Sequence, residues 1–380
     1  MRVAMITGSY PPQPCGVGDY TERIVRELRA AGVDIDVFAT QAEGGRARDG
    51  VFKEVPDWRL GTWRRESRSL LSRTYDVVHL QYPARYYGFR PDLAFLSLIV
   101  RARLPEVPIV VTLHEFRITH PLRKLSSAAI TVPAARVFLT AESEKTVFLR
   151  WLPWMGEKVR IVRLGPTIAV VPVTPERRLQ VRAMYGVEEG AGLIVYFGLL
   201  HPNKGIEALL SSFAQVHAER PSARLLMLSF FEPDRIRYHA ELKKRTTELG
   251  IVEAVIWAGF LPPIAVSEAL GSADIAFLPF QDGVSFRRLS FLTAMLHRLP
   301  VVTTVGLAGR GELQLIDGMN AVLLPADAPP GEFTRRLRLL LDSPRLREAM
   351  GEAAGVWAEP FQWGTIIAET LKAYQEVIRR

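Results

Sequence analysis

Lys204 lies where the sequence predicts that a strand, a loop and a helix meet. Residues 193–197 (LIVYF) form an apolar run typical of a buried strand, and Gly198 ends it. After Gly205, apolar residues recur at helical spacing, at Ile206, Leu209, Leu210, Phe213 and Val216. A helix N-terminus has free N–H groups and a partial positive charge, so a lysine beside it favours a bound anion such as a diphosphate. A solvated loop lysine fits the spacing equally well.

Length and composition limit the class of protein. A chain of 380 residues with 48% hydrophobic side chains predicts two domains with sizeable cores. Cys15 is the single cysteine, which argues against a disulfide framework and a cysteine-based zinc site. No apolar run approaches the roughly 20 residues of a membrane span, and the first residues lack the pattern of a cleaved signal. We therefore expect a cytoplasmic protein.

The excess positive charge lies in the first half of the chain. Residues 1–172 carry 25 Lys+Arg against 17 Asp+Glu, whereas residues 173–380 carry 23 of each. This asymmetry indicates an anionic partner for the first half: a membrane surface, a phosphorylated acceptor or nucleic acid. A general preference for arginine, 40 Arg against 8 Lys, explains it nearly as well. No recognition motif supports nucleic acid, so we expect no nucleic-acid partner.

Residues 58–73 interleave Trp58 and Trp63 with arginines. Such a basic amphipathic stretch is typical of a helix that lies on an anionic membrane, and equally of an ordinary surface helix. Peripheral contact between the basic first domain and the inner face of the membrane is therefore one option for a cytoplasmic protein.

Strands and helices are predicted to alternate along both halves. In the first half we expect strands at 3–7, 33–39, 75–83, 108–116, the start of 137–152, and 159–164. In the second half we expect them at 193–197, 224–229, 254–258, 275–279, 300–304 and 320–324. Residues 165–175 hold three prolines and are predicted to be the interdomain linker. Repeated βα order predicts the α/β class, with two Rossmann-like parallel-sheet domains facing a cleft.

Two glycines follow the first predicted strand, and two aspartates lie within the second. Gly16 and Gly18 are placed in the loop after the first strand, ahead of a helix that starts near residue 21. There they would let a substrate phosphate or sugar approach the backbone. Asp34 and Asp36 have the spacing of a metal-binding Asp-x-Asp, but they lie inside an alternating strand, so we expect no metal site there.

Polar residues end two further strands of the first half. His79 and Gln81 close one strand, and His114 and Glu115 close the next. Ligands bind at the carboxyl edge of a parallel sheet, which makes these side chains candidates for contact with a substrate.

Eight segments, taken in order, resemble the retaining glycosyltransferases of the GT-B fold, in particular the large family four. They are PPQPCGVGDYTERIVRELRAAGVDIDVFA, VVHLQYP, VVTLHEF, FGLLHPNKG, AVIWAGFLP with ALGSADIAFLPF, AMLHRLPVVTT, GELQLIDGMNAVLLP and FQW. The resemblance implies an acceptor-binding domain at 1–170 and a nucleotide-sugar-binding domain at 171–362. It also implies a last helix, within 363–380, that crosses back to the first domain.

The resemblance also implies roles for single residues. Lys204 would hold the donor diphosphate, and His114 would face the transferring sugar. The remaining expected donor contacts are Gly16 and Gly18 at the phosphate and sugar, Gly259 and Phe260 at the base, and Glu312 at the ribose. Expected acceptor-side residues are Asp19, Gln81 and Glu115. Members of this family need no metal, so no metal ligand and no cofactor is expected beyond the nucleotide-sugar substrate.

The sequence departs from the family pattern at the phosphate loop and at a pair of glutamates. Leu199 stands where the family usually has an arginine, and Ser285 and Thr293 stand where it has the two glutamates. Arg287 and Arg288 lie nearby, and either could bind phosphate in place of the missing arginine. The alternative is that both are surface cations. Asp282, Ser285, Ser290 and Thr293 remain candidates near the donor, with the first three suited to hydroxyl contacts.

The sequence thus predicts an enzyme that transfers a sugar, with retention, from a UDP- or GDP-sugar to an acceptor hydroxyl. The expected catalytic residues are His114, Lys204 and Arg287. A lipid-linked, polysaccharide or phosphorylated acceptor fits the basic first half. The alternative, favoured by the lost glutamates and by Leu199, is a non-catalytic GT-B module that binds a nucleotide sugar or a protein partner.

Overall fold

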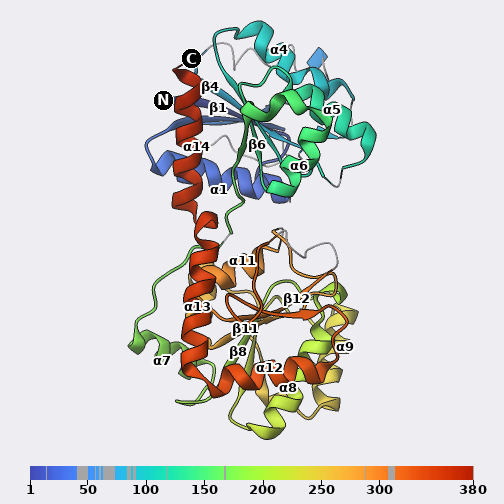
Figure 1. Cartoon of the computed structure of the whole chain (residues 1–380), viewed down its shortest axis with the longest axis vertical. Helices are drawn as coiled ribbons and strands as arrows, with labels where there is room; N and C mark the ends of the chain where they lie inside the picture. Colours follow the sequence, from blue (N-terminus) through green and yellow to red (C-terminus); the bar gives the residue numbers. More distant parts are fainter. Residues whose placement is uncertain are drawn as a thin grey trace. The chain divides into compact units, whose positions relative to one another are not determined.

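Two parallel β-sheets organise the chain, each in its own compact unit (Figure 1). The computed structural model describes residues 1–13, 15–40, 50–55, 57–59, 61–62, 73–83, 87–88, 91–117, 119–166, 168–286, 288–306 and 313–379. The N-terminal unit comprises Met1–Gly165 together with Trp363–Arg380, and the C-terminal unit comprises Pro166–Gln362. Two parallel α/β domains are the predicted class, which is confirmed.

The sheet of the N-terminal unit has the strand order β3-β2-β1-β4-β5-β6-β7. Its strands are β1 (Arg2–Thr7), β2 (Asp34–Thr40), β3 (Val51–Val55), β4 (Val77–Tyr82), β5 (Ile109–Leu113), β6 (Arg136–Leu139) and β7 (Val159–Ile161). Its helices are α1 (Gly16–Ala30), α4 (Leu96–Arg103), α5 (Pro121–Thr131), α6 (Glu142–Trp151) and α14 (Trp363–Ile378), with 3-10 turns η2 (Pro91–Phe95) and η3 (Pro153–Lys158).

The sheet of the C-terminal unit has the order β10-β9-β8-β11-β12-β13. Its strands are β8 (Leu193–Phe197), β9 (Arg224–Leu228), β10 (Val255–Trp257), β11 (Ile275–Leu278), β12 (Val301–Val305) and β13 (Val322–Pro325). Its helices are α7 (Pro175–Met184), α8 (Ile206–Glu219), α9 (Arg237–Glu248), α10 (Pro263–Ser272), α11 (Leu289–Leu296), α12 (Pro330–Asp342) and α13 (Pro344–Ala358). The 3-10 turns are η4 (Pro202–Lys204), η5 (Val252–Ala254) and η6 (Glu359–Phe361).

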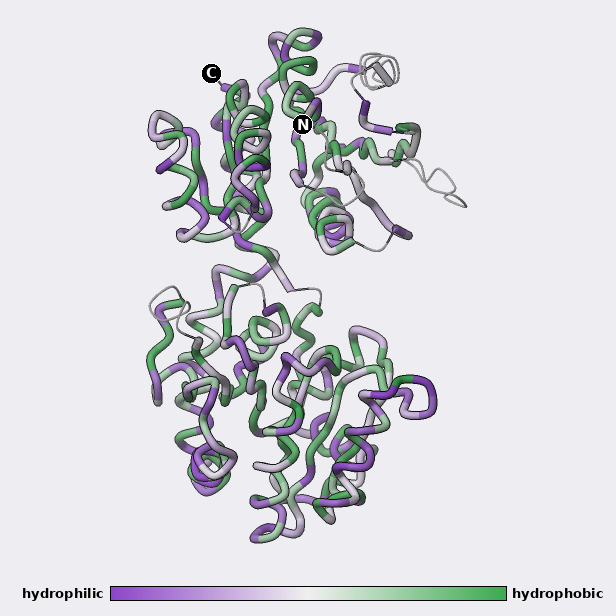
Figure 2. The backbone as a smooth tube through the Cα atoms, turned by 90° about the vertical axis from the view of Figure 1, so that its right-hand side faces the viewer, coloured by the Kyte–Doolittle hydropathy of each residue, from purple (hydrophilic) through white to green (hydrophobic). Residues whose placement is uncertain are grey.

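Each sheet has a point where the direction of strand order reverses. In the N-terminal unit it lies between β1 and β4, and in the C-terminal unit between β8 and β11. Loops that leave two such neighbouring strands turn to opposite faces of the sheet and leave a crevice at its carboxyl edge. The strands are buried on both faces, because helices cover both; Figure 2 shows hydrophobic residues recurring along strands and helices.

Local sequence explains several boundaries. In helices α7 and α13, for example, a proline follows a capping side chain: Thr174 accepts from the Arg177 amide at 3.2 Å, and Ser343 accepts from the Leu346 amide at 3.3 Å. Strand β3 was not among the predicted strands. It is a short strand at the edge of the sheet and pairs with β2 alone. Its formation depends on pairing with β2 rather than on the hydrophobic pattern of its own five residues, so the sequence does not predict it.

Helix α1 begins at Gly16, about a turn earlier than predicted, so Gly16 and Gly18 are helical and do not lie in a loop. The physical reason is packing. Gly18 is buried, and a Cβ on it would lie 3.2 Å from Ser9, so the missing side chain lets the first turn of the helix approach the loop after β1.

The last helix, α14, packs in the N-terminal unit beside α1 (Figure 1, red beside blue). Trp363 lies under the Arg23 guanidinium at 5.4 Å, and a Cβ on Gly165 would lie 2.6 Å from the same indole. Arg136, which is 2% exposed, donates to Glu376 at 3.1 Å. In the part of the chain that the structure describes, no helix is long and apolar enough to cross a membrane.

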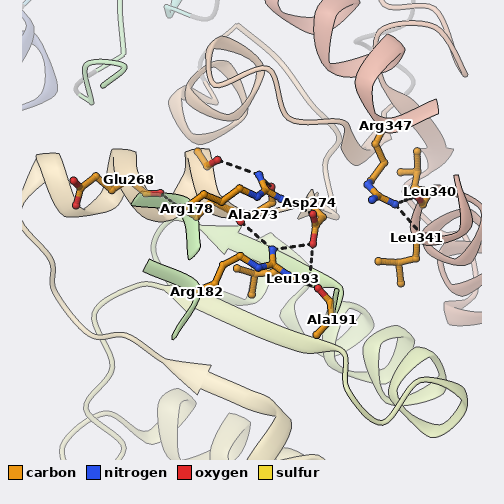
Figure 3. Close-up of polar contacts among 12 residues, drawn as sticks. Arg178, Arg182, Ala191, Leu193, Glu268, Ala273, Asp274, Leu340, Leu341 and Arg347 are labelled. Carbon is orange, nitrogen blue, oxygen red and sulfur yellow. Dashed lines mark hydrogen bonds and ion pairs between the residues drawn. The ribbon is translucent and has the colours of Figure 1, made fainter. Parts of the chain in front are cut away.

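Arginines cap helix ends at the amino edge of the C-terminal sheet (Figure 3). Arg182 donates to the Ser272 carbonyl at the end of α10, and Arg347 donates to the Leu340 and Leu341 carbonyls at the end of α12. Asp274 binds Arg178 at 2.6 Å and Arg182 at 3.1 Å. Cations at helix C-termini compensate the partial negative charge there, so this cluster stabilises the fold.

We expect Asp274→Ala to lower the free energy of unfolding of the C-terminal unit by about 3 kcal/mol, because it leaves the buried Arg182 charge without its carboxylate. Glu248→Ala, which breaks the exposed pair with Arg245, is the control and should cost under about 1 kcal/mol. Urea denaturation of both variants measures the difference. Equal losses would contradict the structural role given to Asp274.

Candidate functional site

Two cations lie over one buried aromatic ring at the switch point of the C-terminal sheet. The Lys204 Nζ lies 5.3 Å from the centroid of the Phe280 ring, and the Arg288 guanidinium carbon lies 4.6 Å from it. Phe280 itself is fully buried. Lys204 ends the β8–α8 loop and Arg288 precedes α11, so loops from both strands of the switch point supply this pair of charges.

The pair carries more positive than negative charge. Arg288 forms an ion pair with Asp282, whose side chain is 63% exposed against 12% for the arginine. Burial, and then the neighbouring Arg288, lower the pKa of Lys204, while Asp282 acts in the opposite direction. Two cations beside one largely solvated carboxylate leave room for a further anion, which would relieve the repulsion between Lys204 and Arg288.

Glycines at positive φ make this geometry possible. Gly205 has φ +70°, and a Cβ on it would lie 1.9 Å from the Pro279 carbonyl oxygen. Gly283 has φ +80°, and a Cβ there would lie 2.1 Å from the Gly306 amide nitrogen. The Gln281 amide also donates to the Asn203 carbonyl at 3.1 Å, which ties the two loops together. Gly205 therefore lets the loops after β8 and β11 approach each other closely, and Gly283 does the same for the loop after β11 and the start of the loop after β12.

The other predicted donor contacts near α11 are uncharged and differ in how far they are buried. Ser290 lies beside Gly198, because a Cβ built on Gly198 would be 3.7 Å from the Ser290 Oγ. Ser285 is partly buried in the loop before α11. Thr293 is buried and its hydroxyl donates to the Leu289 carbonyl at 2.7 Å within α11. Leu199 is 74% exposed and supplies no charge to the pair of cations.

The expected base contacts follow β10 in the C-terminal unit. Gly259 follows β10 at φ +71°, and Phe260 beside it is 85% exposed, so its ring is available for stacking. Glu312 and Arg287 lie outside the described residues, as does most of the basic stretch 58–73. The roles assigned to these residues stay predictions.

Sequence reasoning missed the part of Phe280. It directly follows the strand predicted at 275–279, and no role is predicted for it from the sequence. An aromatic residue directly after a parallel strand at the switch point is the signal that could have indicated it, because its face can carry cations from both loops.

In the N-terminal unit, His114 lies at the carboxyl end of β5 and is 8% exposed. Its Nε2 lies 2.8 Å from the Gln81 Oε1, and the ring of Tyr20 contacts it edge-on with centroids 5.3 Å apart. Burial lowers the pKa of His114 to about 4, so the imidazole is neutral at pH 7. A neutral imidazole can exchange hydrogen bonds with a sugar hydroxyl without attracting a second anion.

The acceptor-side candidates do not all reach solvent. Asp19 lies in the first turn of α1 and is exposed to solvent. Neighbouring atoms still remove part of the water around its carboxyl group, and this desolvation raises its pKa. Glu115 is partly buried next to His114. Gln81 is fully buried, so its side chain contacts His114 rather than solvent. Asp36 binds Arg2, Arg73 and Tyr75, which gives it a structural role.

The C-terminal unit also contains a cavity of 510 Å³ lined by Arg178, Arg182, Arg220 and Arg347. It lies at the amino edge of the sheet, opposite the loops that carry Lys204 and Arg288. Its arginines already bind carboxylates or helix-end carbonyls (Figure 3). An anion there would compete with the helix C-termini, so the candidate site is the carboxyl edge.

Two parallel-sheet α/β units in one chain have the architecture of the GT-B class of two-domain proteins, which solved glycosyltransferase structures share. Residues 15–189 match the family described as glycosyl transferase 4-like domain, and residues 191–343 match glycosyl transferases group 1. The chain belongs to the group 1 glycosyltransferases.

Similar proteins agree with this family. The D-inositol 3-phosphate glycosyltransferase of Kineococcus radiotolerans is 25% identical, over 100% of this chain and 96% of that protein. The α-maltose-1-phosphate synthase of Mycolicibacterium smegmatis is 26% identical, over 99% of this chain and all of that protein. The crystal structure of Anabaena HepE in complex with UDP and glucose has the same fold, with a TM-score of 0.66, 18% identity, and coverage of 98% and 99%.

We expect Gly205→Ala to weaken binding of a nucleoside diphosphate at least tenfold, because the new methyl group would displace the Pro279 carbonyl and with it Phe280. Gly250→Ala is the control, since its φ of +68° is similar but a Cβ there meets nothing within 4 Å. Both substitutions carry the backbone strain of about 1–2 kcal/mol, which urea denaturation reports. Titration calorimetry with UDP should separate them, and the same affinity in both variants would contradict this account.

Proposed function

We propose that this glycosyltransferase moves a sugar from a nucleoside diphosphate to an acceptor hydroxyl, with retention of the anomeric configuration and without a metal ion. The observation that carries the proposal is the pair Lys204 and Arg288 on the ring of Phe280. The two cations come from the loops of the switch point, where nucleotide phosphates bind in sheets of this type.

The charge of the pair suits the leaving group. When the bond between the anomeric carbon and the diphosphate breaks, negative charge grows on the phosphate oxygens. Lys204 and Arg288 stabilise that charge in a partly buried setting, where electrostatic interactions are stronger than in water. A divalent cation performs the same task in metal-dependent transferases, and these two side chains make it unnecessary.

Retention follows if the acceptor attacks the face of the sugar that the diphosphate leaves. An oxygen of the leaving diphosphate then takes the proton of the acceptor hydroxyl, so no dedicated carboxylate base is needed. This accords with Ser285 and Thr293 at the positions where the family has glutamates. His114 supplies a neutral hydrogen-bonding group for the sugar.

The N-terminal unit is proposed to bind a phosphorylated acceptor. Its sequence carries the positive excess of the chain, and the names of both relatives include a sugar or cyclitol phosphate. UDP-glucose is the first donor to test, because HepE was crystallised with UDP and glucose. A lipid-linked acceptor at the inner face of the membrane is the competing version, and it fails if the protein does not float with liposomes that contain anionic lipid.

A non-catalytic module that binds nucleotide sugar is the second candidate, favoured by Leu199 in place of an arginine and by its exposure to solvent. Release of labelled sugar from a radiolabelled donor separates the two. A transferase releases some sugar to water, whereas a binding module releases none. A thermal-shift screen with UDP-, GDP- and ADP-sugars identifies the donor for this assay.

We expect Arg288→Ala and Lys204→Ala each to reduce donor turnover by about 100-fold, because each removes one of two cations on the leaving diphosphate. Arg245→Ala removes the same charge from an exposed ion pair and should leave turnover unchanged. Arg287→Ala in the same series decides which of the two neighbouring arginines carries the role. Near-normal turnover in both arginine variants would refute the site, whatever the fate of the lysine variant.

A further inference from the structure

Helix α5 presents apolar side chains to solvent as well as to the core. Its inward face is buried at Ser127, Ala128, Ile130 and Thr131. Its outward face, which we call the α5 stripe, carries Leu122, Leu125, Ala129 and, at the C-cap, Val132. Leu122, Leu125 and Val132 are 70%, 57% and 50% exposed. Because the outward face of a surface helix is ordinarily polar, this stripe has the character of a contact surface.

Exposed apolar side chains continue on the elements beside α5. Turn η2 and helix α4 pack against α5 (Figure 1), and there Phe95 is 51% and Leu98 is 44% exposed. From α6, the Trp151 ring approaches α5, since the Lys124 Nζ lies 5.9 Å from the centroid of that ring. Trp154 follows at the start of η3 and is 70% exposed. Tryptophan is mostly buried in folded proteins, so this exposure is a second sign of a contact surface beside α5.

The charged side chains of α4 and α5 are all positive: Arg101, Arg103, Arg123 and Lys124. Successive residues of an α-helix are about 100° apart around its axis, so Arg123 and Lys124 leave α5 on opposite flanks of the stripe. Among the described residues, no carboxylate forms an ion pair with Lys124, whose ammonium lies over the Trp151 ring. These cations belong to the positive excess that the sequence shows in residues 1–172.

We propose that the α5 stripe and its flanking cations dock the N-terminal unit on an anionic lipid bilayer. The leucines enter the boundary between head groups and acyl chains, and Arg123 and Lys124 reach the phosphates of the surrounding head groups. Trp154 suits the same depth, because an indole has an apolar ring and a polar N–H. The proposal goes beyond sugar transfer and does not depend on it.

A second copy of the chain fits this surface less well than lipid does. A two-fold dimer brings the same patch of both copies together, so Arg123 and Lys124 of one copy would face those of the other. Neither α4 nor α5 contains an acid that could compensate them. An anionic bilayer offers what both parts of the surface need, an apolar interior below a layer of phosphates. Charge complementarity therefore favours lipid.

The stripe begins near the carboxyl edge of the N-terminal sheet. Helix α5 follows the loop that leaves β5 at His114, and the His120 side chain caps it by accepting from the Leu122 amide at 3.3 Å. The candidate acceptor-side residues Asp19 and Glu115 follow strands at this same edge. Docking thus brings the acceptor side of the unit to the lipid surface. It does not identify the acceptor, because a docked enzyme meets lipid head groups and dissolved phosphates alike.

Flotation of the full-length protein with vesicles tests the docking. We expect the wild type to float with vesicles of equal parts phosphatidylglycerol and phosphatidylcholine. The double substitution Leu122→Gln and Leu125→Gln should lower the apparent affinity by about tenfold or more, because it removes apolar side chains that enter the lipid and keeps good helix formers. Leu339→Gln is the matched control, since Leu339 is 52% exposed on α12, and it should float like the wild type. Failure of the wild type to float overturns the proposal.

The part of the cations is tested by charge and by lipid. Arg123→Gln and Lys124→Gln should each weaken binding to the anionic vesicles by about fivefold, the effect of one cation near such a surface. Lys244→Gln removes the same charge from an exposed position on α9 and should have no effect. Vesicles of phosphatidylcholine alone should bind the wild type weakly. Equal binding to both kinds of vesicle would contradict recognition of an anionic bilayer.

Two further outcomes would also overturn the assignment. If the double glutamine variant floats as the wild type does, the lipid contact lies elsewhere in the chain. If the wild type sediments as a dimer and the double variant as a monomer, the stripe joins two copies of the protein. The unfolding temperature should be unchanged in every variant, because the substituted side chains are at the surface. None of these measurements needs a substrate, so failure of docking is distinguishable from failure of the proposed sugar transfer.

Discussion

The approach of Gly205 to the Pro279 carbonyl is the constraint on which the site of the C-terminal unit depends. A glycine at φ +70° with no room for a Cβ lets the loop after β8 pass directly over the end of β11. Phe280 follows at once, and its ring receives cations from both loops. Backbone packing therefore brings the two cations together, and a single exposed carboxylate, Asp282, pairs with Arg288.

Arginines at the two edges of the C-terminal sheet have different partners. At the amino edge, Arg182 and Arg347 donate to carbonyls at helix C-termini, whose partial negative charge they compensate. At the carboxyl edge, Arg288 shares one exposed aspartate with Lys204 beside it. The direction of the helices relative to the strands explains the difference, since a parallel sheet presents helix N-termini at one edge and C-termini at the other.

Much of the fold could be predicted from the sequence, because strands buried on both faces leave strong apolar patterns: the strand predicted at 193–197 is β8. The start of α1 could not, since Gly16 and Gly18 favour a loop until Ser9 is seen against the helix. In the site, the sequence predicts Lys204 and either Arg287 or Arg288 as phosphate ligands, and the structure places Lys204 and Arg288 on one ring, that of Phe280. The contacts of Phe280 with Lys204 and of Gln81 with His114 join segments far apart in sequence, which no local pattern encodes.

The return of α14 to the N-terminal unit makes the C-terminal unit an insertion, joined by two covalent connections, after Gly165 and before Trp363. During synthesis the C-terminal unit is complete before the ribosome has released the residues that finish the N-terminal one. Tyr374, which bonds to His79, follows the whole C-terminal unit along the chain. The buried His79 of the N-terminal sheet thus takes its partner from a helix on the far side, in sequence, of the whole C-terminal unit, and loss of α14 would leave its Nδ1 without the Tyr374 hydroxyl.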